Sequence, residues 1–198
     1  MTYRPFVVLF LALAPLAAAQ DAKKPNLYPL DLGNKWEYEL SAKSEPDMKV
    51  EIITEVTSSE TKNGKLTARL TATAGGMKKG EQVASDERGV YRNGVSGLIS
   101  DREFLIIKYP VIKGDTWREK VRIKGAEIEM KFEVGDVEEV KVPAGKYKAT
   151  PFRTTAKVNG TDTQTTKWFG EGVGMVKETM TLNDQTYIME LKKFTPGN

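Results

Sequence analysis

The stretch YPLDLGNKW, residues 28–36, returns in similar form as YPVIKGDTW, residues 109–117. Both copies contain a Tyr-Pro pair, a glycine and then a tryptophan at the same spacing. Proline interrupts strand pairing, glycine permits a turn with positive φ, and the tryptophan can then begin a strand with its side chain facing inward. The stretch therefore predicts a corner that leads into a β-strand, and its recurrence predicts that this corner is built twice.

Further matches occur at the same offset of 81 positions, the difference between residues 117 and 36. They pair Val56 with Val137, Gly64 with Gly145, Lys65 with Lys146 and Ala68 with Ala149. Agreement at a single spacing indicates a duplicated β-unit. We therefore expect two similar halves, about residues 28–108 and 109–194, within one β domain spanning residues 20–198.

The first residues have the pattern of a secretory signal peptide. Arg4 supplies a positive charge, residues 6–13 are almost wholly apolar, and residues 17–19 are the small residues of a cleavage site. We expect residues 1–19 to be removed, so that the mature chain begins near Gln20. The apolar run is too short to cross a bilayer, and no later segment approaches about 20 apolar residues, so no transmembrane segment is expected after cleavage. Because the chain has no cysteine, a lipid anchor on that residue type is excluded.

Composition and charge narrow the classes of function. Removing residues 1–19 takes away Arg4 and no acidic residue, which leaves 30 minus 1 basic residues against 27 acidic residues and a net charge of +2. This balance argues against a nucleic-acid partner, which needs a clustered basic face. The absence of His and Cys excludes the common zinc sites and Ser-His or Cys-His catalysis. We therefore expect no metal site, no cofactor and no enzymatic activity.

Alternation of apolar and polar residues with period two dominates the chain from Leu27 onward, which is typical of β-strands. Hairpin turns are predicted at Asn63-Gly64, Asn93-Gly94, Asn159-Gly160 and Asn183-Asp184-Gln185. The spacing of these turns predicts an all-β fold of about ten strands. A sheet of this size must bend to bury its apolar face. We expect a single strongly curved antiparallel sheet that forms a half-barrel or a closed barrel.

One hairpin can be aligned residue by residue. A two-residue turn at Gly125-Ala126 places Arg122 opposite Glu129 and Val121 opposite Met130, so that charges pair on one face and apolar residues on the other. The alignment puts Glu119 on the inward face, where desolvation would favour the protonated carboxyl group and general-acid chemistry. We favour either fraying of the strand end or an ion pair of Glu119 with a nearby Lys or Arg, because the sequence identifies no second catalytic carboxylate.

The segment WFGEGVG, residues 168–174, is the most unusual part of the chain. Its glycine spacing is similar to that of a phosphate-binding loop, but no helical pattern or Lys-Ser/Thr pair follows, so close backbone packing is the favoured interpretation. Together with YPLDLGNKW and with VPAG, residues 142–145, this segment resembles a broad family of exported bacterial proteins of unknown function. The resemblance implies no catalytic residue. More loosely, one wrapped antiparallel sheet is similar to the lipoprotein-carrier fold of the bacterial envelope.

The expected function is non-catalytic binding in the periplasm or outside the cell of a bacterium. The concave face of a bent sheet would hold an apolar or amphipathic ligand, such as a lipid or a lipoprotein segment, against aromatic and methionine side chains. The candidate ligand-binding residues are Trp36, Trp117, Trp168, Phe169, Met130 and Met180. The alternative is a structural or protein-interaction module of the envelope that has no small-molecule ligand and recruits partners through edge strands.

Overall fold

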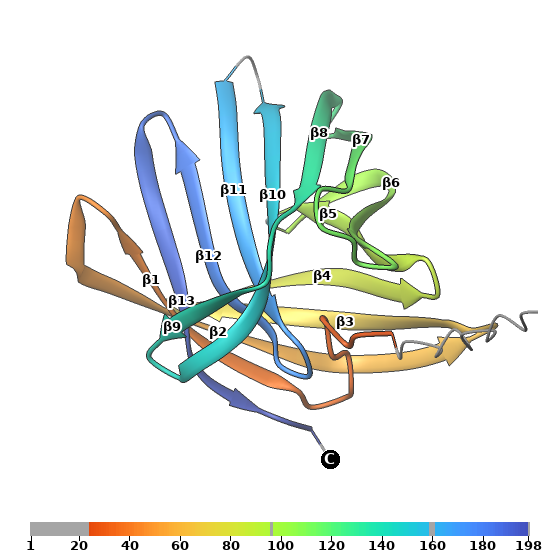
Figure 1. Cartoon of the computed structure of the whole chain (residues 1–198), viewed down its shortest axis with the longest axis horizontal. Helices are drawn as coiled ribbons and strands as arrows, with labels where there is room; N and C mark the ends of the chain where they lie inside the picture. The colour runs from red at the N-terminus through yellow and green to blue at the C-terminus, as the bar shows by residue number, and fades with distance from the viewer. Residues whose placement is uncertain (1–23, 96, 159–160, 198) are drawn as a thin grey trace, which may run out of the picture.

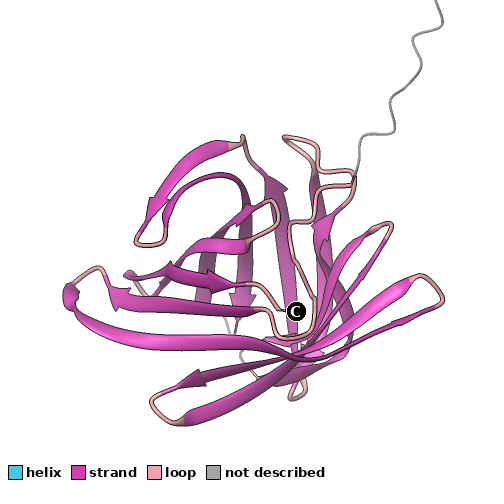
Figure 2. Cartoon of the chain, turned by 90° about the horizontal axis from the view of Figure 1, so that it is seen from below, coloured by secondary structure: helices cyan, strands magenta, loops and turns pink. Residues whose placement is uncertain are grey.

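The strands of this protein form one antiparallel sheet that closes on itself (Figure 1). The computed structural model describes residues 24–95, 97–158 and 161–197, so the expected signal peptide and the expected Asn159-Gly160 turn lie outside the described residues. In this described part no helix is long and apolar enough to span a membrane, and Figure 2 shows only strands and loops.

The strands are β1 (Lys35–Ala42), β2 (Glu45–Lys62), β3 (Lys65–Ala74), β4 (Met77–Asp86), β5 (Gly89–Val95), β6 (Leu98–Lys108), β7 (Thr116–Ile123), β8 (Ala126–Val134), β9 (Glu138–Val142), β10 (Gly145–Val158), β11 (Thr161–Gly170), β12 (Gly174–Leu182) and β13 (Gln185–Thr195).

Twelve of the thirteen strands make a closed ring. The ring closes because β13 pairs with β1, while β10 pairs with β8 on one side and β11 on the other. The remaining strand, β9, follows β8 after a short break and pairs with the first residues of β10. The all-β prediction is confirmed, and the sheet is a closed barrel with slightly more strands than the predicted ten.

Two of the predicted Asn-Gly turns have different outcomes in the structure. Asn63-Gly64 forms the predicted turn, with φ values of 51° and 75° between the paired residues Lys62 and Lys65. Asn93-Gly94 does not, because both residues lie inside β5, and the chain reverses only between Val95 and Leu98. A Cβ on Gly94 would lie 2.2 Å from the Leu98 carbonyl oxygen, so this glycine permits close strand approach instead of a turn.

The β7–β8 hairpin turns one residue earlier than predicted. Lys124 and Gly125 both have positive φ, 48° and 81°, which suits a two-residue hairpin turn. Ile123 therefore lies opposite Ala126, and the register differs from the predicted one by two residues. Since side chains alternate with period two, the same residues still face the core. The outward charges pair diagonally, with Arg118 2.6 Å from Glu129.

The two Tyr-Pro stretches share the turn that leads into the next strand, although the Tyr109-Pro110 peptide bond is cis and the Tyr28-Pro29 bond is not. Gly33 and Gly114 have φ values of 82° and 81°. The Gly33 amide donates to the Val56 carbonyl at 3.0 Å, and the Gly114 amide donates to the Val134 carbonyl at 2.9 Å. In each case the tryptophan is the second residue of the strand that follows, β1 or β7.

The strand bounds continue this parallel, since Lys35–Ala42 and Thr116–Ile123 differ by the offset found in the sequence. The individual residue matches do not all follow it. Val134 occupies the place that the sequence comparison gave to Val137, and Val137 is 63% exposed while Val56 is fully buried. The duplication itself stays an inference from the sequence, and the corner is its best-preserved part.

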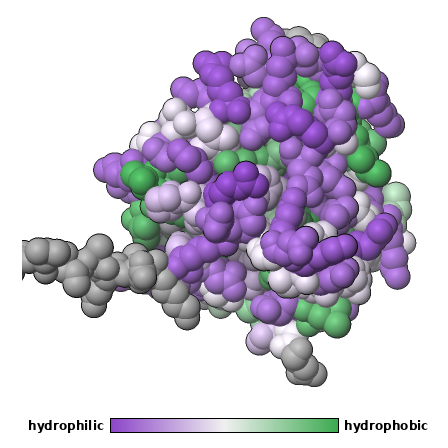
Figure 3. Space-filling view, turned by 90° about the vertical axis from the view of Figure 1, so that its right-hand side faces the viewer, coloured by the Kyte–Doolittle hydropathy of each residue, from purple (hydrophilic) through white to green (hydrophobic). Residues whose placement is uncertain are grey.

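Apolar side chains fill the barrel as two clusters. The larger cluster joins residues from before β1 to β13, and includes Leu30, Trp36, Val56, Phe169 and Leu191. The smaller cluster belongs to β6, β7 and β8 and consists of Phe104, Val121, Ile123, Met130 and Phe132. Figure 3 shows a mainly hydrophilic face on which hydrophobic patches are separate from one another.

Candidate functional site

A cavity of about 450 Å³ lies within the barrel. One end is closed by aromatic side chains, among them Trp36 and Phe169. The Trp36 ring stacks on Phe194 with a centroid separation of 5.5 Å, and its Nε1 donates to the Val173 carbonyl at 2.6 Å. Phe169 contacts Tyr28, which also lines the cavity, at a centroid separation of 5.7 Å. These contacts fix an aromatic wall at the inner end.

The other end of the cavity opens towards the β3–β4 turn. Leu40, Ile52 and Met189 form an apolar wall that leads in that direction. Met77, the first residue of β4, also lines the cavity and is 69% exposed, so it lies at the mouth. A ligand could therefore reach the lumen without separation of the strands.

Between these two ends the lining is charged. Arg92 on β5 forms an ion pair with Glu81 on β4, and Lys167 on β11 lies 3.5 Å from Glu178 on β12. All four side chains line the cavity. Burial raises the pKa of the Tyr28 phenol far above its ordinary value; Glu81 and Glu178 add to this effect, and Arg92 opposes it. Carboxylates from opposite sides of the ring, those of Glu81 and Glu178, therefore line the same cavity.

Two of the six predicted ligand-binding residues, Trp36 and Phe169, line the cavity. Trp117 lies instead against the smaller cluster, where it stacks on Phe132 with a centroid separation of 5.1 Å and an interplanar angle of 4°. Met130 is buried in the same cluster. Trp117 and Met130, which the sequence analysis named as candidate ligand-binding residues, therefore pack in the smaller cluster and do not line the cavity.

Trp168 and Met180 lie elsewhere. Trp168 points to the face of β11 opposite to that of Phe169, and its Nε1 donates to the Glu138 carboxylate of β9. The β10–β11 pairing requires this, because it places Val158 opposite Thr161 and Trp168 opposite Pro151. Met180 follows Glu178 by two residues on β12 but is 37% exposed and lies outside the cavity lining. A ligand-binding role for any of the six residues stays a prediction.

The charged lining residues were missed by the sequence analysis, although the sequence does contain a signal. Glu81 shares a strand face with the buried Val83, and Lys167 shares one with Phe169. Charged residues at inward positions of an otherwise apolar alternation indicate a polar interior. Their pairing could not be predicted, because the sequence analysis identified no turn at residues 87–88, where the chain reverses between β4 and β5.

Glu119 has a structural role in the wall of the barrel. Its carboxylate accepts from Arg102 Nη2 at 2.8 Å and from the Leu105 amide at 3.2 Å. The predicted ion pair with a basic residue is confirmed. Glu119 does not line the cavity.

The glycine-rich segment packs against the first corner, as expected from its composition. Gly174 has a φ of 91°, and a Cβ there would lie 3.3 Å from Trp36 Nε1 and 3.4 Å from Pro29 Cδ. Gly174 also lines the cavity. Small residues are therefore needed here to bring the β11–β12 connection close to Trp36, which supports the interpretation of close backbone packing.

Comparisons with known proteins identify the fold. No protein-family model matches the chain, and neither does any curated protein sequence. The chain resembles the structure of a candidate lipoprotein from Parabacteroides distasonis, with a TM-score of 0.61 and 12% identity over 87% of this chain and 100% of that one. It also resembles a candidate exported protein with a YmcC-like fold from Bacteroides fragilis, with a TM-score of 0.53 and 12% identity over 85% of this chain and 98% of the other. Likeness at this identity shows a shared fold.

Proposed function

We propose that this protein is an exported, non-catalytic binding protein of the bacterial envelope, and that it holds an apolar or amphipathic ligand inside the barrel. The observation that carries the proposal is the cavity of about 450 Å³, lined by Trp36, Phe169 and Met189 and open near Met77. Its volume falls within the range of about 300–1,000 Å³ found for small-molecule sites. Aromatic and methionine linings suit apolar chains because they offer a large, adaptable contact area.

Export and an envelope location are supported by two independent observations. Residues 1–19 have the pattern of a signal peptide. The two structures that share the fold belong to a candidate lipoprotein and a candidate exported protein. These structural neighbours support export to the envelope. Only the cavity supports the proposed ligand.

The non-catalytic part of the proposal is supported by the chemistry of the lining. With no His and no Cys in the chain, acid–base chemistry would fall to carboxylates. The two carboxylates in the cavity, those of Glu81 and Glu178, each pair with a basic side chain. Such pairing leaves both carboxylates already engaged with a basic partner, which suits a binding surface better than proton transfer.

Blocking the cavity tests the proposal. Ala72 lines the cavity, whereas its neighbour Thr73 points to the other face of β3, so A72W and T73W form a matched pair. After incubation with a bacterial lipid extract and gel filtration, mass spectrometry should detect lipid on the wild type and on T73W and at least about tenfold less on A72W, because the new indole fills the site. Circular dichroism should show both variants folded.

The outcome separates the two expected functions. Absence of bound lipid from the wild type, together with unchanged tryptophan fluorescence, would overturn the binding proposal and favour the structural or protein-interaction module. The protein-interaction alternative assumed that exposed edge strands recruit a partner. The closed ring weakens this alternative, because pairing around the ring leaves few such edges. Among the described strands, β9 pairs with a single neighbour, β10.

A further inference from the structure

The charged residues of the cavity form a belt across the middle of the lumen. Glu81 and Arg92 come from β4 and β5, whereas Lys167 and Glu178 come from β11 and β12, on the opposite side of the ring. The aromatic wall lies on one side of this belt and the apolar wall of Leu40, Ile52 and Met189 on the other. A purely apolar ligand would cover these charged groups without forming any polar contact with them, so the lumen is better suited to a molecule with a polar group.

Arg92 retains hydrogen-bonding capacity beside the cavity. A guanidinium group has five N–H donors. In the described residues, only Nη2 of Arg92 donates to a side chain, namely the Glu81 carboxylate. The buried Nε has no hydrogen-bond partner. A buried donor without an acceptor destabilises the fold, so an acceptor entering the cavity would gain from a modest shift of this side chain.

The side chains that line the cavity carry a net positive charge. Three basic residues, Lys79, Arg92 and Lys167, and two acidic residues, Glu81 and Glu178, line the cavity, which gives a net charge of +1. Lys79 has no carboxylate within ion-pair distance among the residues that the structure describes. The Tyr28 phenol, which burial holds in its protonated form, adds a neutral donor. An acceptor with one negative charge would balance this set.

We infer that the barrel selects amphiphiles with an anionic head group, a carboxylate or a phosphate, which binds at Arg92 while the chain lies along the wall of Leu40, Ile52 and Met189. This inference rests on the proposed function and names its ligand class. Charge-assisted hydrogen bonds to a guanidinium are stronger than neutral ones and favour planar or multidentate oxygen acceptors. The head group therefore supplies specificity, and the chain supplies apolar contact area.

Titration with four dodecyl probes tests the inference. Dodecanoate, dodecyl phosphate, 1-dodecanol and dodecyltrimethylammonium share one chain and differ in head group, and each is used below the concentration at which it aggregates. Isothermal titration calorimetry should show the two anionic probes binding about 10- to 100-fold more tightly than the alcohol, as expected for a hydrogen bond to a charged group. The cationic probe should bind most weakly.

Variants at the belt locate the head group. R92Q should reduce the preference for anionic probes over the alcohol to about threefold or less, because only neutral donors remain. The control is R118Q, which removes an exposed Arg that pairs with Glu129 on the outer surface and should leave the preference unchanged. Since R92Q leaves Glu81 without its partner, the double variant E81Q/R92M provides a neutral, similarly sized replacement. Thermal unfolding checks the fold of each variant.

Each outcome has a distinct meaning. If the wild type binds none of the four probes, the proposed function fails. If it binds all four with similar affinity, the proposed function stands and the anionic head group is wrong. If E81Q/R92M keeps the full anionic preference, the head group does not bind at Arg92 and the inference is overturned.

Discussion

The barrel wall is joined very differently at the two places where the two predicted halves of the sequence meet. At the first junction, all eight residues of β1 pair with β13. At the second, a single residue pair, Ser100 with Ile123, joins β6 to β7. Both β1 and β7 follow the same Tyr-Pro corner, so the corner determines the local turn and the position of its tryptophan but not the pairing of the strand that follows.

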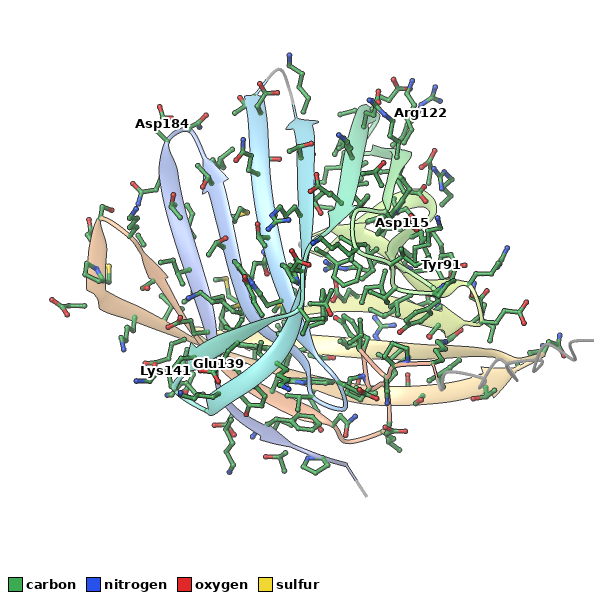
Figure 4. The ribbon with its side chains drawn as sticks, viewed as in Figure 1. Tyr91, Asp115, Arg122, Glu139, Lys141 and Asp184 are labelled. Atoms are coloured by element: carbon green, nitrogen blue, oxygen red, sulfur yellow. The ribbon has the colours of Figure 1, made fainter. Side chains whose placement is uncertain are left out.

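Side chains replace the missing backbone ladder at the β6–β7 junction. Glu119 bridges to Arg102 and to the Leu105 amide, and Trp117 Nε1 donates to the Leu105 carbonyl at 3.0 Å. Farther along, the Asp101 carboxylate accepts from the amide of Arg122, a residue labelled at the end of β7 in Figure 4. Polar side chains thus satisfy backbone groups that a neighbouring strand would otherwise pair.

Tyr38 and Glu119 show what this difference means for the lumen. Each lies two residues after the tryptophan of its corner. Because β1 is held by a full ladder, the Tyr38 side chain can reach towards β12, where its hydroxyl donates to the Met175 carbonyl at 2.9 Å. The Glu119 side chain instead accepts hydrogen bonds from Arg102 and the Leu105 amide across the β6–β7 junction. The first corner therefore faces a cavity, and the second faces a packed cluster.

Replacing the two tryptophans should produce the largest effects. W36A removes a side chain that is 3% exposed, its stack on Phe194 and its hydrogen bond, and we expect the free energy of unfolding to fall by about 3–5 kcal/mol. W117A should cost less, about 3 kcal/mol, because that ring is only partly buried. Urea unfolding followed by circular dichroism measures both values. A larger loss for W117A would mean that the β6–β7 junction is the stronger of the two.

Removing the Glu119 carboxylate from the β6–β7 junction should have the next largest effect. E119A leaves the Leu105 amide without this acceptor and removes the ion pair of Arg102, which keeps its bonds to the Glu103 and Lys120 carbonyls; the expected cost is about 1–3 kcal/mol in unfolding free energy. The matched control E129A removes a carboxylate of the same hairpin whose partner, Arg118, is exposed, and should cost at most about 1 kcal/mol. Equal losses in urea unfolding would show that Glu119 does not hold the wall.

Hydrogen exchange should sharpen the comparison at the level of single amides. We expect amides of β1 that face β13 to exchange more slowly than amides of β7 that face β6, because local opening needs few broken bonds at the second junction. In E119A, protection of the Leu105 amide should fall by about tenfold or more. NMR-detected exchange measures this, and an unchanged Leu105 rate would contradict the bridge seen here.

The smallest expected effect concerns Tyr38 and alkaline pH. Burial raises the pKa of Tyr38 well above its ordinary value, so the phenol stays protonated in the folded chain while it ionises in the unfolded chain above pH of about 10. Its stabilising contribution is therefore present below this pH and is lost as the pH rises further. Y38F should cost about 1 kcal/mol at pH 7 through the lost bond to Met175, and the gap to wild type should narrow at pH 11. Urea unfolding at both pH values measures the gap, and a constant gap would exclude this linkage.

Local chemistry made part of this structure predictable. The Tyr-Pro corners, the turn at Asn63-Gly64 and the inward faces of Trp36 and Phe169 follow from glycine, proline and period-two alternation within short segments. The β7–β8 register was wrong by two residues because Lys124, a residue without special turn preference, adopts positive φ.

Contacts across the ring were not predictable in this way. The pairing of β13 with β1 and the presence of Glu81 and Glu178 in one cavity depend on which strands become neighbours or face each other, and no local pattern encodes that. Trp168 was assigned to the interior because aromatic residues are usually buried there. The β10–β11 register places it opposite Pro151, and its indole N–H bonds to Glu138 while the ring packs against the larger cluster and does not line the cavity.

The ladder between the first and last strands also affects how the chain folds. Lys35 lies opposite Thr195, so β1 has its partner only when the end of the chain has been made. Contacts of such long sequence separation slow folding, typically to milliseconds or seconds, because distant segments must meet before they stabilise each other. The backbone edge of β1 therefore stays unpaired until β13 is in place. The C-terminal strand thus acts as the completing step of assembly, and a chain truncated before Gln185 would keep an unpaired edge along Tyr38 and Leu40.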